Sequence, residues 1–236
     1  MTRLEVSNLV SGYQGTAAVR GIDLEVAAGE VVVLLGANGA GKSTTLLAIA
    51  GEVPVMSGSI NYEGAPFAGP LHRRARAGLA FVPEERSIFR QLTVDENVAL
   101  GRGAPSEVYK LAPELEPIRR RKAGLLSGGE QQILTLARAL AGEPRLLLAD
   151  ELSLGLAPLV ATQMLQLARR AADRGVAVLL VEQSAKRAFD VADRAYVLQR
   201  GKIVIEGSAT ELRQRMSEVV AAYSLAHGGR AGHTSS

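Results

Sequence analysis

The stretch Gly36-Ala-Asn-Gly-Ala-Gly-Lys-Ser43 decides the fold, because it follows an apolar run at residues 30–35 and leads into a helix-forming segment at residues 42–50. It fits the pattern G-x-x-x-x-G-K-[ST], which has a physical mechanism. The glycines let the backbone turn so that successive N–H groups point inward around phosphate oxygens. The following helix adds the positive end of its dipole. We expect Lys42 to bind the β- and γ-phosphates of a nucleotide and the Ser43 hydroxyl to bind Mg²⁺.

A chance glycine turn is the alternative interpretation of this loop. The loop, however, stands where the pattern requires it, between a buried strand and a helix. The predicted phosphate-binding residues are Gly36, Asn38, Gly39, Ala40, Gly41, Lys42, Ser43 and Thr44.

Two acids follow a second apolar run. Residues 146–149 are Leu-Leu-Leu-Ala, and Asp150 and Glu151 come directly after them. Ligands of open parallel sheets bind at the carboxyl ends of the strands, so we expect both acids to lie beside the phosphate loop. Asp150 would share Mg²⁺ with Ser43, directly or through water, and Glu151 would polarise the water that attacks the γ-phosphate. A pair of helix-capping acids is the alternative.

The pattern around these motifs predicts an α/β fold. Near-alternating apolar residues at 4–9 and 19–26 indicate an N-terminal antiparallel β subdomain, with a turn at Ser11-Gly12. Alternation of strands and helices in the last third indicates right-handed βαβ crossovers and a parallel core sheet. The expected elements there are strands at 146–149, 176–181, 195–198 and 203–205, and helices at 128–141, 159–172 and 184–191.

The middle of the chain differs from the rest. Residues 83–124 hold four of the nine prolines and the run Arg119-Arg-Arg-Lys122. We expect a short inserted helical subdomain at about 83–141, with helical pieces at 94–100 and 106–111. The whole predicts one domain over residues 1–226 and a Gly/Ser-rich disordered tail at 227–236.

Composition excludes several classes of protein. The 236 residues include no cysteine, which excludes a disulfide scaffold, a cysteine-ligated metal site and a cysteine nucleophile. No apolar run approaches the roughly 20 residues of a membrane-spanning helix, so we expect a cytoplasmic chain. The net charge is +3, and residues 71–122 hold eleven Lys/Arg against seven Asp/Glu. A nucleic-acid surface is one interpretation, but the low aromatic content of 4% favours a solvated face and no nucleic-acid partner.

A third motif, Leu126-Ser-Gly-Gly-Glu-Gln-Gln132, lies between the phosphate loop and the acidic strand. In isolation it is a serine N-cap that opens a helix. The ordered set of three motifs resembles the nucleotide-binding subunit of ABC transporters over residues 4–225, which implies the P-loop NTPase fold of ABC ATPases with ATP and Mg²⁺ as ligands. The resemblance implies that Tyr13 stacks on adenine. It also implies that two chains sandwich two ATP molecules head to tail, with Ser127, Gly128 and Gly129 reaching the partner's γ-phosphate and Ser153-Leu-Gly155 touching the partner.

Two positions depart from the general superfamily pattern. Glu84 stands where a glutamine usually follows the strand at 79–82, and Gln183 stands where a histidine usually contacts the γ-phosphate. Gln183 can donate an amide hydrogen bond but cannot carry a proton. By resemblance, Glu84 contacts Mg²⁺ and the nucleotide, and Gln183 acts in catalysis with Lys42 and Glu151.

Four further motifs narrow the resemblance. They are Pro83-Glu-Glu-Arg-Ser-Ile-Phe89, Leu92-Thr-Val-Asp-Glu-Asn97, Ser153-Leu-Gly-Leu-Ala-Pro158 and Val181-Glu-Gln183. Together they resemble the second ATPase subunit of branched-chain amino acid importers and its urea and amide relatives, a branch in which Glu84 and Gln183 are ordinary. The implied function is an ATP-hydrolysing subunit that energises such an importer.

The same branch implies a set of partners. It places the subunit at the inner face of the cell membrane, on transmembrane permease subunits, as a homodimer or with a sister ATPase. A periplasmic-type binding protein would act indirectly. Leu152 replaces a usual proline, and the segment 100–124 is shorter than in relatives. Ser87-Ile-Phe-Arg90 is similar to the ATPase of lipopolysaccharide export, so that exporter, a non-transport ABC ATPase and a regulatory clamp stay as alternatives.

Overall fold

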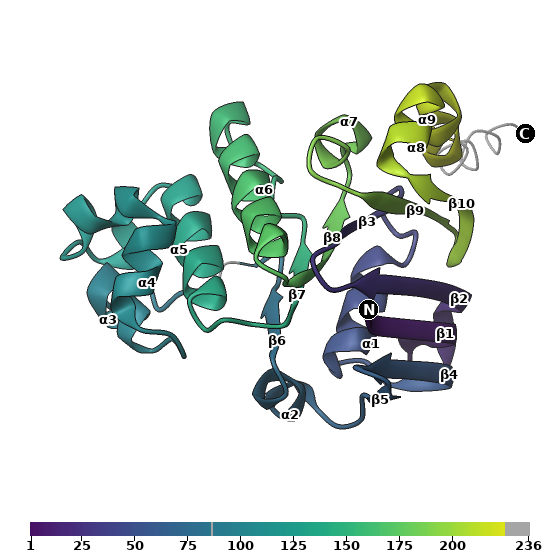
Figure 1. Ribbon diagram of the computed structural model, residues 1–236, viewed down its shortest axis with the longest axis horizontal. Helices are drawn as coiled ribbons and strands as arrows, with labels where there is room; N and C mark the ends of the chain where they lie inside the picture. The colour runs from purple at the N-terminus through teal and green to yellow at the C-terminus, as the bar shows by residue number, and fades with distance from the viewer. Residues whose placement is uncertain (86, 225–236) are drawn as a thin grey trace, which may run out of the picture.

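The N-terminal sheet is antiparallel, as predicted. The computed structural model describes residues 1–85 and 87–224 (Figure 1). This sheet has the order β2-β1-β4-β5, and its register pairs Leu4 with Val26 and Val6 with Leu24. Its strands are β1 (Thr2–Tyr13), β2 (Thr16–Ala27), β4 (Val55–Tyr62) and β5 (Ala65–Pro66).

The predicted turn at Ser11-Gly12 is wrong. Strand β1 continues through both residues, and the chain turns at Gln14-Gly15, where φ is 49° and 79°. Ser11 is fully buried and pairs with Val19, so it lies inside the sheet. The register shifts between Ser11 and Gly12, which marks a β-bulge that imitates a turn in the sequence pattern.

The second sheet is the parallel core. Its order is β10-β9-β3-β8-β7-β6, and all of its pairs are parallel except β9 with β10. Every residue of β3, β7 and β8 is buried, as expected for strands covered on both faces. Its strands are β3 (Val31–Leu35), β6 (Leu79–Val82), β7 (Leu146–Asp150), β8 (Ala177–Glu182), β9 (Arg194–Gln199) and β10 (Lys202–Ser208).

Helices cover both faces of this core. Helix α1 (Lys42–Ala50) contacts β1, β2, β7 and β8 and so lies between the two sheets. On the other face, α5 (Gly128–Leu140) and α6 (Pro158–Asp173) pack together and bury Leu134, Leu136 and Met164. Figure 1 shows α3, α4 and α5 at one end of the molecule and the antiparallel sheet at the other, with β6, β7 and β8 of the core sheet between them.

The remaining helices are short. They are α2 (Leu71–Arg76), α3 (Val94–Ala99), α4 (Pro105–Leu111), the 3₁₀ segments η1 (Pro113–Ile118) and η2 (Ala123–Leu125), α7 (Ala185–Ala188), α8 (Ala209–Gln214) and α9 (Met216–Ser224). The predicted fold class is therefore confirmed. The predicted tail at 227–236 lies outside the described residues. Within 1–85 and 87–224, no helix has both the length and the apolarity needed to cross a bilayer.

Candidate active site

The phosphate loop joins β3 to α1 at the carboxyl edge of the parallel sheet. Two of its glycines have no substitute. Gly36 has φ of 155°, and a Cβ there would lie 2.3 Å from the Leu198 carbonyl oxygen. Gly41 has φ of 107°, and a Cβ would lie 2.8 Å from the Ala18 carbonyl oxygen. The backbone can therefore adopt this curve only without side chains at these two positions.

Lys42 is buried inside the loop. Its Nζ donates to the carbonyl oxygens of Gly36 at 2.9 Å and Ala37 at 3.1 Å. Burial lowers the pKa of Lys42, and the nearby charges of Glu151 and Asp150 oppose that shift. Thus the protein's own carbonyl groups hold the ammonium at the centre of the loop.

The other loop residues divide by exposure. Ala40 and Thr44 are buried, Ser43 is half-buried, and Asn38 and Gly39 form the exposed tip. The Ala40 amide donates to the Ala37 carbonyl oxygen at 3.1 Å. The tip therefore leaves its polar groups available to solvent or ligand.

The acidic pair ends β7 on the same edge. Glu151 has φ of 50°, a left-handed conformation that costs a non-glycine residue about 1–3 kcal/mol. Its amide donates to the Val181 carbonyl oxygen at 2.9 Å. Its Oε1 lies 3.9 Å from Lys42 Nζ, and Gln183 Nε2 donates to both of its carboxylate oxygens at 2.7 Å. Three predicted catalytic residues therefore meet at one point.

Asp150 has an unused oxygen beside Ser43. Its Oδ1 is buried and has no hydrogen-bond partner in the described chain. Burial raises the pKa of Asp150 to about 6, a shift that the Ser43 hydrogen bond opposes and the charges of Glu151 and Glu84 reinforce. A carboxylate oxygen without a donor, next to a serine hydroxyl, is a ligand pair that suits Mg²⁺. The residues present therefore fit this ion.

Glu84 lies close to the acids, although it comes from a third strand end. It follows β6 in an exposed loop, and it lines a polar cavity of about 500 Å³ together with Gln131, Gln132 and Glu151. The structure thus brings Glu84 to the site from a position 66 residues before Asp150 in the chain.

Tyr13 and residues 127–129 are placed differently. Tyr13 ends β1 and is 52% exposed. Ser127 caps α5: its Oγ accepts from the Glu130 amide at 3.3 Å, and Glu130 Oε2 accepts from the Ser127 amide at 2.7 Å. The helix start at Gly128 and Gly129 is half-buried. Both of these hydrogen bonds join Ser127 to Glu130, so they do not connect Ser127 to the phosphate loop.

Comparison with known proteins decides the family. The family described as ABC transporter matches residues 19–153. The high-affinity branched-chain amino acid transport ATP-binding protein BraG of Pseudomonas aeruginosa is 44% identical over 214 residues, which cover 86% of this chain and 92% of BraG. The chain belongs to the ABC transporter family.

Other ABC proteins match over similar lengths. The lipopolysaccharide export system ATP-binding protein LptB of Escherichia coli K12 is 34% identical over 91% of this chain and 94% of its own. The solved structure of an ATP-binding subunit of an ABC transporter has a TM-score of 0.80 at 28% identity, over 93% of this chain and 98% of that one. A nucleotide-free ATP-binding cassette has a TM-score of 0.84 at 24% identity, over 94% and 98%, and shows the fold alone. The predicted ABC ATPase fold and its ATPase activity are confirmed.

Sequence reasoning missed two contacts of this ABC site. Glu182, directly before Gln183, is 2% exposed, and both of its oxygens accept from Ser153. Gln131 is also buried, and its Nε2 donates to the carbonyl oxygens of Ala123 and Leu126, which shapes the chain just before Ser127. In both cases the sequence signal was a polar residue at a position where the apolar pattern predicts a buried side chain.

Proposed function

We propose that this chain is the ATP-hydrolysing subunit of an importer for branched-chain amino acids or related amino acids and amides. The observation that carries the chemistry is the Glu151 carboxylate, which Gln183 holds by both oxygens beside Lys42. The similarity to BraG supports the substrate class.

The proposed mechanism uses these residues for positioning and electrostatics. Lys42 exchanges its two backbone carbonyl partners for the β- and γ-phosphate oxygens. Glu151 accepts a hydrogen bond from the attacking water, and Gln183 fixes the direction of that carboxylate without carrying a proton. Ser43, Asp150 and Glu84 would hold Mg²⁺, which supplies positive charge to the phosphates.

A complete site in this proposal needs two chains. Tyr13 is exposed and available to stack on adenine. The start of α5 presents the N-terminal dipole of a 13-residue helix and the Ser127 hydroxyl to a γ-phosphate on the facing chain. The second chain is a second copy or a sister ATPase.

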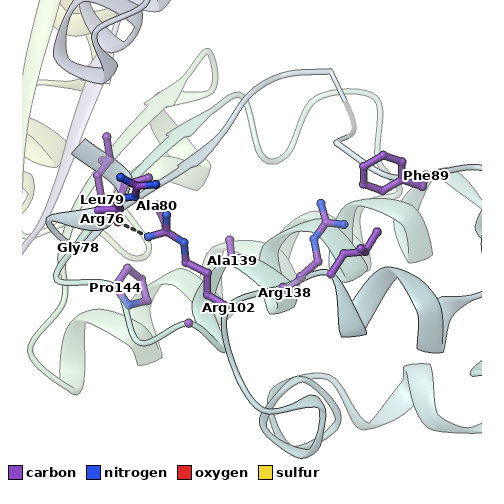
Figure 2. Close-up of a pocket in the computed structure, with 13 residues that line it drawn as sticks. Arg76, Gly78, Leu79, Ala80, Phe89, Arg102, Arg138, Ala139 and Pro144 are labelled. Atoms are coloured by element: carbon purple, nitrogen blue, oxygen red, sulfur yellow. Dashed lines mark hydrogen bonds between the residues drawn. The ribbon is translucent and has the colours of Figure 1, made fainter. Parts of the chain in front are cut away.

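A cavity of about 390 Å³ between α2, β6 and α5 supports docking on a membrane partner (Figure 2). Phe89 and Leu100 line it and are 56% and 57% exposed. Figure 2 shows Arg102 and Arg138 between Phe89 and Arg76. We propose that a cytoplasmic segment of a permease subunit, with apolar and acidic side chains, binds here, which would place the chain at the inner face of the membrane.

The sequence motif at 92–97 positions one of the residues that line this cavity. Thr93 caps α3 in a capping box with Glu96. Asn97 is fully buried; its Oδ1 accepts from the Phe89 amide at 2.8 Å, and its Nδ2 donates to the Phe89 carbonyl oxygen at 3.0 Å. The motif therefore holds the exposed Phe89 in place for a partner.

The Glu151→Gln variant tests the chemistry. Positioned acid–base groups contribute roughly 10²–10⁴-fold, so steady-state hydrolysis should fall by that factor while ATP binding persists. Hydrolysis at the wild-type rate would refute the assignment.

Transport assays test the substrate class. Vesicles that contain the chain, its two permeases and an amino acid binding protein should take up leucine when MgATP is inside. The second candidate is lipopolysaccharide-type export, which the LptB similarity and the exposed Phe89 of Ser87-Ile-Phe-Arg90 favour. Stimulation of hydrolysis by an export permease, without amino acid uptake, would select that candidate. A chain without turnover beside intact permeases would indicate a regulatory clamp.

A further inference from the structure

The end of β8 holds the turn after β7 at three consecutive residues. The Val181 carbonyl oxygen accepts from the Glu151 amide at 2.9 Å. Glu182 accepts from Ser153, and Gln183 donates to Glu151. The last side chain of β8 and the side chain that follows it therefore bind alternate residues of one loop.

Both oxygens of Glu182 are used by Ser153. Oε1 accepts from the Ser153 amide at 3.1 Å, and Oε2 accepts from the Ser153 hydroxyl at 2.7 Å. Glu182 is 2% exposed and Ser153 is 4% exposed. Two bonds to one residue fix its orientation as well as its position, because rotation of Ser153 would break one of them.

Burial of the Glu182 carboxylate at this position costs free energy. Burial raises the pKa of Glu182, and the Ser153 bonds oppose the shift. Charges packed near it include Glu151, which raises this pKa, and Arg187, which lowers it. An apolar side chain would suit the burial better, so the acid indicates a need for directed bonds.

Glu151 is the residue whose backbone conformation these bonds help to stabilise. It has the left-handed φ of 50° two residues before Ser153, and such a conformation persists where neighbouring contacts over-determine it. Leu152 between them is 1% exposed and gives the turn an apolar anchor. Without the Ser153 bonds, Glu151 keeps its amide bond to Val181, the bond from the Leu154 amide to its carbonyl oxygen at 3.1 Å, and the contact of its carboxylate with Gln183.

We propose that Glu182 is a positioning residue for ATP hydrolysis, which acts through Ser153 to hold the turn that aims the Glu151 carboxylate. The proposal rests on the proposed role of Glu151. The same bonds anchor the start of residues 153–155, where Leu154 is 47% exposed on the surface expected to touch the second chain.

Steady-state hydrolysis of MgATP by the full chain tests this proposal. Glu182→Leu removes both bonds and keeps a similar volume, and it should lower kcat about 100-fold with KM for ATP within about threefold, since a small misplacement of a reacting group has that scale. Ser153→Ala removes the hydroxyl bond alone and should lower kcat about tenfold. The double variant should lose no more than Glu182→Leu, because both changes break one contact.

Glu182→Gln is the conservative rescue. Its carbonyl oxygen can accept from the Ser153 amide, and its NH₂ can donate to the hydroxyl, so kcat should stay within about fivefold of wild type. Leu179→Ala in β8 is the matched control. Leu179 is fully buried, and it belongs to a different core cluster from Leu152, the residue next to Ser153. The variant should lower the unfolding midpoint but leave kcat per folded molecule unchanged.

Each outcome decides between the two proposals. Loss of hydrolysis in Glu151→Gln with normal kcat in Glu182→Leu would overturn the positioning role alone. Normal hydrolysis in Glu151→Gln would overturn the proposed function itself. A Glu182→Gln variant as impaired as Glu182→Leu would also contradict the positioning role. If Glu182→Leu does not fold, the double variant of Ser153→Ala and Glu182→Gln is compared with the two single variants. Losses of kcat that add in the double variant would contradict the positioning role.

Discussion

Replacement of Asp150 by asparagine should stabilise the nucleotide-free protein. Burial raises the pKa of this carboxyl from 3.8 to about 6, and its Oδ1 has no hydrogen-bond partner among the described residues. The folded chain thus binds this proton more tightly than the unfolded chain. The resulting stabilisation is complete below about pH 4 and is lost as the pH rises through 6.

The magnitude follows from the same pKa. At about 1.36 kcal/mol per pKa unit, ionisation of Asp150 at pH 7.5 removes about 3 kcal/mol of unfolding free energy. Asparagine has no charge to desolvate, and its amide oxygen can still accept from Ser43. An unpaired NH₂ group in the same place costs about 1 kcal/mol, so the net gain should be about 2 kcal/mol.

The assay is urea unfolding of both proteins, in chelator, at pH 7.5 and pH 5. The gain should be large at pH 7.5 and smaller at pH 5. Saturating MgATP should reverse the order, because a neutral amide is a poorer ligand for Mg²⁺ than a carboxylate. Glu52→Gln, an exposed acid after α1, is the control and should change neither value. A variant that is less stable at pH 7.5, or a difference that ignores pH, would refute the reasoning.

Three other changes have defined outcomes. Lys42→Ala removes the cation that Gly36 and Ala37 hold, so light scattering should detect no nucleotide-dependent dimer; a persisting dimer would count against the site. Gly36→Ala places a Cβ 2.3 Å from the Leu198 carbonyl oxygen and should abolish ATP binding in calorimetry, while normal affinity would show that the loop can relax. Leu134→Ala empties a fully buried position on α5 and should lower the unfolding free energy by about 2–5 kcal/mol in urea, against which an unchanged midpoint would speak.

The chemistry-bearing segments were predictable because their function requires local sequence. A phosphate loop needs glycines at fixed spacing, and Asp150 and Glu151 must end a strand that is buried on both faces. The role of Gln183 was predicted only from the family resemblance. The structure explains why Gln183 meets these residues, since β3, β8 and β7 are neighbours in the parallel sheet.

Other features depend on tertiary contacts. Strand β4 was not predicted, because five of its eight residues are exposed and carry no alternation. The bulge at Ser11-Gly12 resembles a turn unless the partner strands are known. The bond between Glu182 and Ser153 joins residues 29 apart, which no local pattern encodes. In contrast, α8 begins with a capping box of Ser208 and Glu211, a local pattern that indicates a helix start from sequence alone.

Gln183 has a consequence for how the cell can regulate this subunit. Its amide neither gains nor loses a proton in the physiological range, so Gln183 itself adds no pH dependence to its contact with Glu151. A histidine in this place would make turnover a sensor of internal pH. With glutamine, the catalytic step is controlled by the conformational changes that bring the residues of the site together. Any pH dependence of turnover should therefore come from other groups, such as Asp150, and not from the residue at position 183.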